Sequence, residues 1–217
     1  MIYRSQQLST LLLAMLLSTA VVSHAQENEL KSVKFGEEET LYSFQNKNNE
    51  LIINAVGQDS ASGLFVSQPE ACLNENQLSW SWKVDLIQPT ADITVKDKED
   101  FAASLLIIFG KPGLFSKPKG LIYAFTNTDL PIGTVVNSPR APENFRTIVL
   151  DNNQSLLMNW SRYERNIIAD YKLAYGEVPD KSLHSIGVFT DNDQTKEPVK
   201  ASYNLESCNL SAQKQLG

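Results

Sequence analysis

The stretch Leu78-Ser79-Trp80-Ser81-Trp82-Lys83-Val84-Asp85-Leu86 decides the fold. Apolar residues occupy its even positions and polar residues its odd positions, which is the period of a β-strand with one buried face. Because Trp80 and Trp82 share the face that also carries leucine and valine, the pattern favours burial of both rings in a core over an exposed sugar-binding platform.

Other segments along the chain have the same strand character. Residues 101–109 are almost continuously apolar, which predicts a central strand buried on both faces. Clusters of Asn, Asp, Gly and Pro separate the segments and predict turns. The remaining expected strands are residues 41–44, 50–56, 62–67, 120–126, 145–150, 156–163, 183–190 and 199–205.

One segment departs from the strand period. Ile167, Ile168, Tyr171 and Tyr175 form a helical stripe that a glycine ends, so we expect one short helix over about residues 165–175. The chain has no internal repeat and no linker-like stretch. It therefore predicts a mainly β protein, a single jelly-roll β-sandwich with one short helix, spanning residues 26–217.

The first 25 residues have the three parts of a secretory signal peptide. Arg4 lies in the positive start, residues 11–22 are apolar, and Ser23-His24-Ala25 is a small-x-small cleavage site. The apolar run is about a dozen residues, whereas a membrane-spanning helix needs roughly 20. We therefore expect residues 1–25 to be removed, leaving an exported protein, periplasmic or extracellular, with no transmembrane anchor in the mature chain.

The charge of the mature chain argues against some partners. Removal of Arg4 leaves 18 basic against 25 acidic residues. Such an acidic surplus is not typical of proteins that bind nucleic acid or anionic lipid through a basic surface. His184 is then the only histidine, too few for a typical zinc site, and it alternates with serines in a strand as an ordinary polar-face residue does.

Cys72 and Cys208 are the only two cysteines. In an oxidising compartment they have only each other to pair with, which predicts one disulfide. Two buried free thiols are the alternative. The alternation of residues 199–205 would place Cys208 on the polar face unless it breaks near Ser207.

Acidic residues supply the candidates for acid-base chemistry. Glycosidases place two carboxylates across the bond that they cleave, and the chain offers Glu164, Asp170, Asp191 and Asp193. An enzyme would use Glu164, Arg165, Asp170 and Tyr171. Because Glu164 and Asp170 do not share a helix face, a catalytic pair needs separate segments, and solvated carboxylates around Arg165 are the simpler interpretation.

Arg165 would lie in the first turn of the expected helix, where the helix dipole disfavours a cation. Its position therefore indicates a specific partner. That partner is either a nearby Asp or the carboxylate of a ligand held by the guanidinium fork.

Oxygen donors gather in residues 191–195, Asp191-Asn192-Asp193-Gln194-Thr195. The segment either forms a hydrogen-bonded turn or binds Ca²⁺ through Asp191 and Asp193. It is not an EF-hand, because Lys196 and Ser202 stand where that loop needs glycine and glutamate. Apart from this calcium hypothesis we expect no cofactor.

Aromatic residues other than the tryptophan pair are candidates for a ligand groove. Tyr123, Phe125, Trp160 and Tyr163 lie in or beside expected strands with polar neighbours. With Arg165, Asp191 and Asp193, the residues Tyr123, Trp160 and Tyr163 make up the expected ligand-binding set.

Several motifs occur in the order typical of one bacterial secreted family. They are Ser60-Ala61-Ser62-Gly63-Leu64, the Leu78–Val84 strand, Asp100-Phe101-Ala102, Glu164-Arg165 with Asp170-Tyr171, and Thr190-Asp191-Asn192-Asp193-Gln194-Thr195. On these motifs the mature chain resembles the family known as domain of unknown function 3047. The resemblance implies export and a jelly-roll, carbohydrate-binding-like fold, with no assigned reaction. Asn166, Glu99 and Phe125 depart from the residues usual in that family.

The sequence therefore favours an exported, non-catalytic β-sandwich module that binds a glycan or another cell-envelope ligand. One alternative is a polysaccharide hydrolase or lyase with a carboxylate, Arg and Tyr cleft. The other is an envelope structural or interaction protein without a small ligand.

Overall fold

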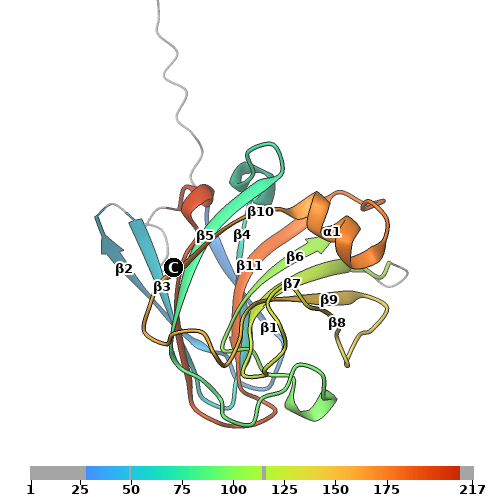
Figure 1. The fold of residues 1–217 in the computed structure, drawn as a ribbon. Coiled ribbons are helices and arrows are strands. Elements are labelled where there is room, and N and C mark those ends of the chain that lie inside the picture. Colours follow the sequence, from blue (N-terminus) through green and yellow to red (C-terminus); the bar gives the residue numbers. More distant parts are fainter. Residues whose placement is uncertain (1–27, 49, 114–115, 211–217) are drawn as a thin grey trace, which may run out of the picture.

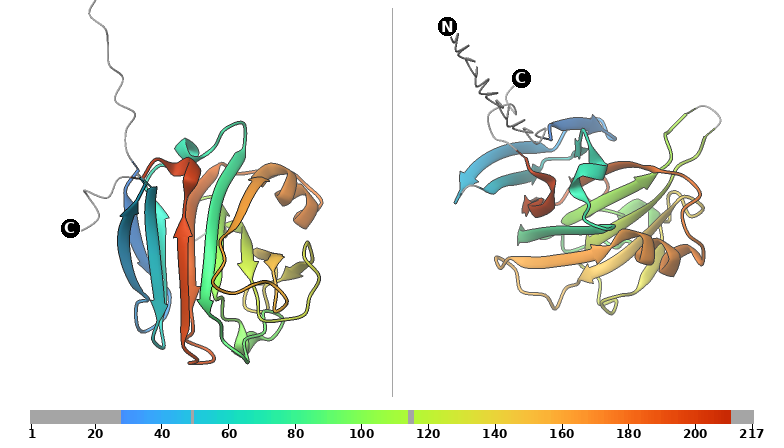
Figure 2. Two further views of the ribbon diagram at one scale, coloured as in Figure 1. Left: turned by 60° about the vertical axis from the view of Figure 1, so that its left-hand side comes forward. Right: turned by 90° about the horizontal axis from the view of Figure 1, so that it is seen from above.

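The structure is a computed structural model that describes residues 28–48, 50–113 and 116–210. This described part contains twelve strands in two sheets, one α-helix and three short 3₁₀ helices. The two sheets lie face to face, as the views of Figure 2 show. The mainly β jelly-roll sandwich with one short helix is thereby confirmed, whereas the expected signal peptide lies outside the described residues.

The larger sheet has seven strands. In spatial order they are β1 (Leu30–Lys34), β4 (Ala61–Val66), β11 (Leu183–Asp191), β6 (Ala103–Phe109), β7 (Lys119–Phe125), β9 (Phe145–Asp151) and β8 (Val135–Asn137). Neighbours are antiparallel except β7 and β9, which are parallel. The strand predicted over residues 101–109 is β6, the middle strand of this sheet, and it is buried throughout.

The smaller sheet has five antiparallel strands. In spatial order they are β10 (Ser161–Asn166), β5 (Gln77–Leu86), β12 (Val199–Asn204), β3 (Glu50–Gly57) and β2 (Leu41–Lys47). β10 leads directly into α1 (Ile167–Tyr175) at one end of the sandwich (Figure 1). The 3₁₀ helices are η1 (Pro69–Cys72), η2 (Lys96–Lys98) and η3 (Glu206–Cys208). No helix of the described residues is long and apolar enough to cross a membrane.

The tryptophan pair of β5 lies in the core between the sheets, as its alternation predicts. Trp80 and Trp82 are fully buried. The Trp80 ring lies 5.1 Å from Tyr123 of the opposite sheet and 5.5 Å from Tyr163 of the neighbouring strand, centroid to centroid. Each ring removes a large apolar area from water, so this cluster is a main contributor to the packing of the two sheets.

Several predicted boundaries are wrong by two or more residues, as at β2, which runs to Lys47, and β6, which starts at Ala103. The strand expected from residue 156 starts at Ser161, because the preceding residues turn, with Met158 in the left-handed region at a φ of 63°. The helix expected from residue 165 starts at Ile167, because the Asn166 side chain accepts hydrogen bonds from the backbone N–H groups of Ile168 and Ala169 as an N-cap. β1 and β8, which are short and contain no buried residue, were not predicted from the sequence.

The Cys72–Cys208 disulfide is present, with both residues buried. β12 ends at Asn204, and η3 then breaks the strand alternation and turns Cys208 inward. The bond ties η3 to η1, which follows β4 of the larger sheet. It joins residues 136 positions apart, so it greatly restricts the unfolded chain.

We predict that replacing both cysteines by alanine lowers the free energy of unfolding by about 3–5 kcal/mol, since the cross-link closes a long loop in the unfolded state. Urea unfolding of the oxidised protein and of the double variant measures the difference. A loss below about 1 kcal/mol would contradict the proposed contribution of the bond.

Candidate functional site

The four residues expected to form a catalytic site, Glu164, Arg165, Asp170 and Tyr171, do not come together in one cleft: Asp170 and Tyr171 are buried, whereas Glu164 is exposed. Arg165 lies near the end of β10 and donates two hydrogen bonds to the Asp170 carboxylate, at 2.8 and 2.5 Å. The Tyr123 hydroxyl donates to the same carboxylate at 2.7 Å, and Tyr171 is buried. Glu164 is exposed and points to the opposite face of β10 from Arg165. Arg165 thus has the nearby Asp as its partner, and the set divides into an internal network and one surface carboxylate.

Two of the expected ligand-binding rings belong to the interior. Tyr123 is fully buried, so the structure contradicts its place on an open ligand face. Tyr163 is half-buried and donates a 2.5 Å hydrogen bond to Asp151, which also accepts from Trp82 Nε1. Burial, followed by the hydrogen bond to Asp151, raises the pKa of the Tyr163 hydroxyl. Both hydroxyls therefore act as donors within the fold.

We predict that Asp170→Ala lowers the free energy of unfolding by about 2–3 kcal/mol, because Arg165 and the Tyr123 hydroxyl lose their common acceptor. Glu164→Ala, on the exposed face of β10, should change it by less than about 0.5 kcal/mol. Chemical denaturation of the two variants measures both values. Equal effects would contradict the division into a structural network and a free carboxylate.

A polar groove lies on the outer face of the five-stranded sheet, with a volume of about 650 Å³. All five strands contribute side chains to it. Its lining includes Gln45 of β2, Asn54 of β3, Ser202 of β12, Ser81 and Lys83 of β5, and Arg162 of β10. Ser81 and Lys83 of β5 therefore face this groove while its tryptophans face the core.

Trp160 lies at one edge of the polar groove and is 44% exposed. It is the one residue of the expected ligand-binding set whose ring lines this surface. The charges near it are compensated: Arg162 pairs with Glu206 at 2.6 Å, and Lys83 pairs with Asp85 at 2.8 Å. The groove thus combines an exposed flat ring with amide, hydroxyl and paired ionic groups.

An apolar pocket of about 280 Å³ lies on the outer face of the seven-stranded sheet. Its walls are mostly aromatic and aliphatic. They are formed by Phe35, Phe101, Leu106, Ile122, Phe145 and Phe189. Carboxylates of Glu99, Asp191 and Asp193 line the same pocket, beside Arg140 and Gln194.

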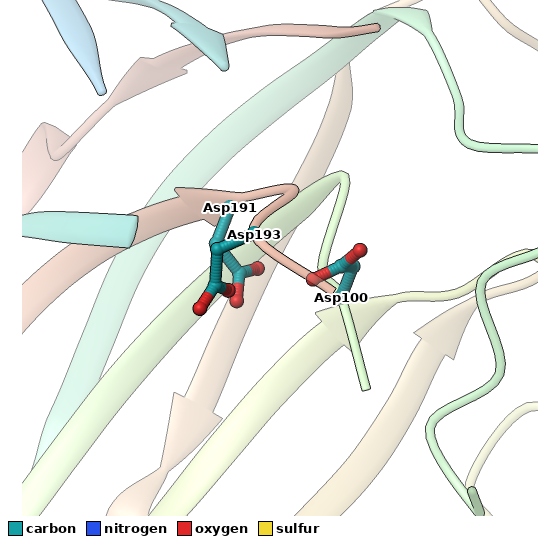
Figure 3. A group of neighbouring side chains, drawn as sticks. All are labelled: Asp100, Asp191 and Asp193. Atoms are coloured by element: carbon teal, nitrogen blue, oxygen red, sulfur yellow. The ribbon is translucent and has the colours of Figure 1, made fainter. Parts of the chain in front are cut away.

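Asp191 and Asp193, which line this acidic side of the pocket, have Asp100 as a neighbour. Figure 3 shows the three side chains. Asp100, Asp191 and Asp193 each offer a carboxylate oxygen, and the three oxygens lie within 4.8 Å of one another. Asp191 accepts from the Phe101 backbone N–H at 2.7 Å, while Asp100 accepts three hydrogen bonds from Gln194 and Thr195. Burial raises the pKa of Asp191 well above its usual value, and Asp100 raises it further. Both effects favour the neutral carboxyl group of Asp191, and a cation beside the cluster would favour the charged form instead.

These three carboxylates are also the residues that could hold a metal ion. Their hard oxygen ligands suit Ca²⁺, and Asp100 adds a third ligand to the two expected from the sequence. Calcium binding at this cluster stays a prediction. The turn over residues 191–195 is at the same time hydrogen-bonded, with the Lys196 N–H donating to the Asn192 carbonyl at 2.8 Å.

Sequence reasoning missed Glu99 and Arg140 as residues of the pocket. In the sequence, Glu99 is notable only because it departs from the residue usual in the family, and Arg140 belongs to no recognisable motif. The Phe101 and Phe189 rings could have been found from the strand period, because Phe189 shares its strand face with Asp191. No signal in a single sequence brings Glu99 and Arg140 to the same pocket.

Comparisons with known proteins give a family and a distant structural likeness. The chain is similar to a solved structure at 11% sequence identity. That structure is described as "Comparison of Family 12 Glycoside Hydrolases and Recruited Substitutions Important for Thermal Stability". The alignment covers 80% of this chain and 96% of that chain, with a TM-score of 0.26. No curated protein matches the sequence.

The family described as "Protein of unknown function (DUF3047)" matches residues 28–205, which is nearly the whole described part of the chain. This match agrees with the resemblance that the ordered motifs carry in the sequence. The chain belongs to the DUF3047 family.

Proposed function

We propose that the chain is an exported, non-catalytic binding module that takes a neutral glycan in the polar groove of the five-stranded sheet. The observation that carries the proposal is the exposed Trp160 ring at the edge of a groove lined by hydroxyl and amide side chains. An aromatic ring presents a flat apolar face on which the apolar face of a pyranose can stack. The surrounding groups can donate to and accept from sugar hydroxyls.

The extent of the groove favours an extended ligand. Its lining residues come from all five strands. Because adjacent strands lie about 4.8 Å apart, the groove crosses about 19 Å of sheet. That span suits several consecutive sugar units better than a single monosaccharide.

The charge balance of the groove favours a neutral ligand. Arg162 and Lys83 are paired with Glu206 and Asp85, so each of these two basic charges is balanced by a neighbouring carboxylate. Lys47 lies directly opposite Glu50 in the β2–β3 pairing. The Cys72–Cys208 disulfide fits the oxidising compartment in which envelope glycans occur.

We predict that Trp160→Ala weakens binding of the retained polysaccharide by about 10-fold or more, since the stacking surface is lost. This corresponds to about 1.4 kcal/mol. Affinity electrophoresis of the mature protein in gels that contain neutral or acidic bacterial polysaccharides identifies the ligand, and calorimetry measures the change in Kd.

Leu156→Ala is the matched control, because Leu156 is an exposed apolar residue of the same connection that does not line the groove. It should leave Kd unchanged, and both variants should melt within about 2 °C of the parent. Absence of retardation by every polysaccharide would contradict the proposal. Release of new reducing or unsaturated ends would instead favour the hydrolase or lyase alternative.

A further inference from the structure

We propose that the apolar pocket of the seven-stranded sheet is a second binding site, and that it takes a protonated amine carried on an apolar body. The site lies on the other sheet from the polar groove and does not depend on glycan binding. Three features carry the inference: the aromatic wall, the charge of the acidic side, and one buried carboxylate oxygen that accepts no hydrogen bond.

The aromatic wall provides an apolar surface beside the carboxylates. Phe189 is its centre, with Phe35 at 5.5 Å and Phe101 at 6.3 Å between ring centroids, both edge to face. Phe35 is 54% exposed and so lies at the mouth of the pocket. Aromatic faces attract organic cations and also pack against the carbon body that bears the charge. A metal ion alone would make no use of this wall.

The acidic side carries more carboxyl groups than basic groups. Glu99, Asp191 and Asp193 line the pocket, and Asp100 lies behind them. Arg140 is the single basic residue of the lining; its guanidinium pairs with Glu99 at 3.7 Å and also donates a hydrogen bond to Gln194, so it balances one of the three carboxylates of the lining. A bound cation would reduce the repulsion among the carboxylates, whereas a neutral or anionic ligand would not.

The Glu99 carboxylate supplies a specific acceptor. Its side chain is 4% exposed, and its Oε1 accepts a 2.7 Å hydrogen bond from the Ser138 hydroxyl. Its Oε2 is buried and accepts no hydrogen bond from the described residues, although Arg140 Nε lies 3.7 Å away. Buried polar atoms without a partner are uncommon in folded proteins. An ammonium N–H is a donor of the right charge for this oxygen.

The size of the pocket limits the ligand. A volume of about 280 Å³ is at the lower end of the range of small-molecule sites. The pocket therefore suits a small arylalkyl amine, or the amine-bearing end of a larger molecule.

Calorimetry with 2-phenylethylamine and its neutral analogue 2-phenylethanol tests the proposal on the mature protein. We expect saturable binding of the amine that weakens with added NaCl, and binding of the alcohol at least about 10-fold weaker. Phe35→Ala and Asp193→Asn should each weaken amine binding by about 5-fold or more.

Val33→Ala and Asp59→Asn are the matched controls. Val33 is an exposed apolar residue of β1, and Asp59 is an exposed aspartate paired with Lys196; neither lines the pocket. Both should leave the Kd for the amine within about 2-fold, and melting curves show whether each variant is folded. Equal affinity for amine and alcohol, or no effect of Phe35→Ala and Asp193→Asn, would overturn the proposal. A CaCl₂ titration that saturates the acidic side and shows no competition with the amine would also overturn it.

Discussion

Trp80 and Trp82 project from β5 into the space between the sheets, where Trp80 packs against Tyr123 and Tyr163. Because side chains alternate along a strand, this packing also fixes the direction of Ser81 and Lys83, which point away from the core into the polar groove. A shift of β5 by one residue would expose both indoles and bury the polar side chains. The groove therefore depends on the same contact that joins the two sheets.

The outer faces of the two sheets differ in polarity, so the two proposed sites suit different kinds of ligand. The five-stranded sheet presents polar side chains to its groove, whereas the outer face of the seven-stranded sheet carries a cluster of buried apolar side chains. Glycine contributes to the second face: a Cβ on Gly63 or Gly187 would lie 2.8 or 2.5 Å from the Phe65 ring. These two positions thus let an aromatic ring lie close over the strands, beside the phenylalanines of the pocket.

The fold was largely predictable because its main signals are local. The alternation of β5 and of the other strand segments predicts a sandwich, and the presence of only two cysteines favours one disulfide over two free thiols. The candidate sites were less predictable, because they join distant segments. Asp100 and Asp191 are 91 positions apart in the sequence and come together only in the fold. The sequence left two kinds of partner open for Arg165, and the hydrogen bonds to Asp170 decide between them. Tyr123 resembles a groove residue in sequence, yet its hydroxyl has an internal acceptor in Asp170.

Hydroxyl-radical footprinting of the tryptophans tests the central claim most directly, since the three indoles report on the core and on the groove in one experiment. It compares the mature protein alone with the protein saturated by the polysaccharide that retards it most in electrophoresis. The account predicts that Trp160 is oxidised in the free protein and protected by the polysaccharide, while Trp80 and Trp82 resist oxidation in both states. Oxidation of Trp160 that does not change when the polysaccharide is bound, or ready oxidation of Trp80 and Trp82 in the free protein, would contradict it.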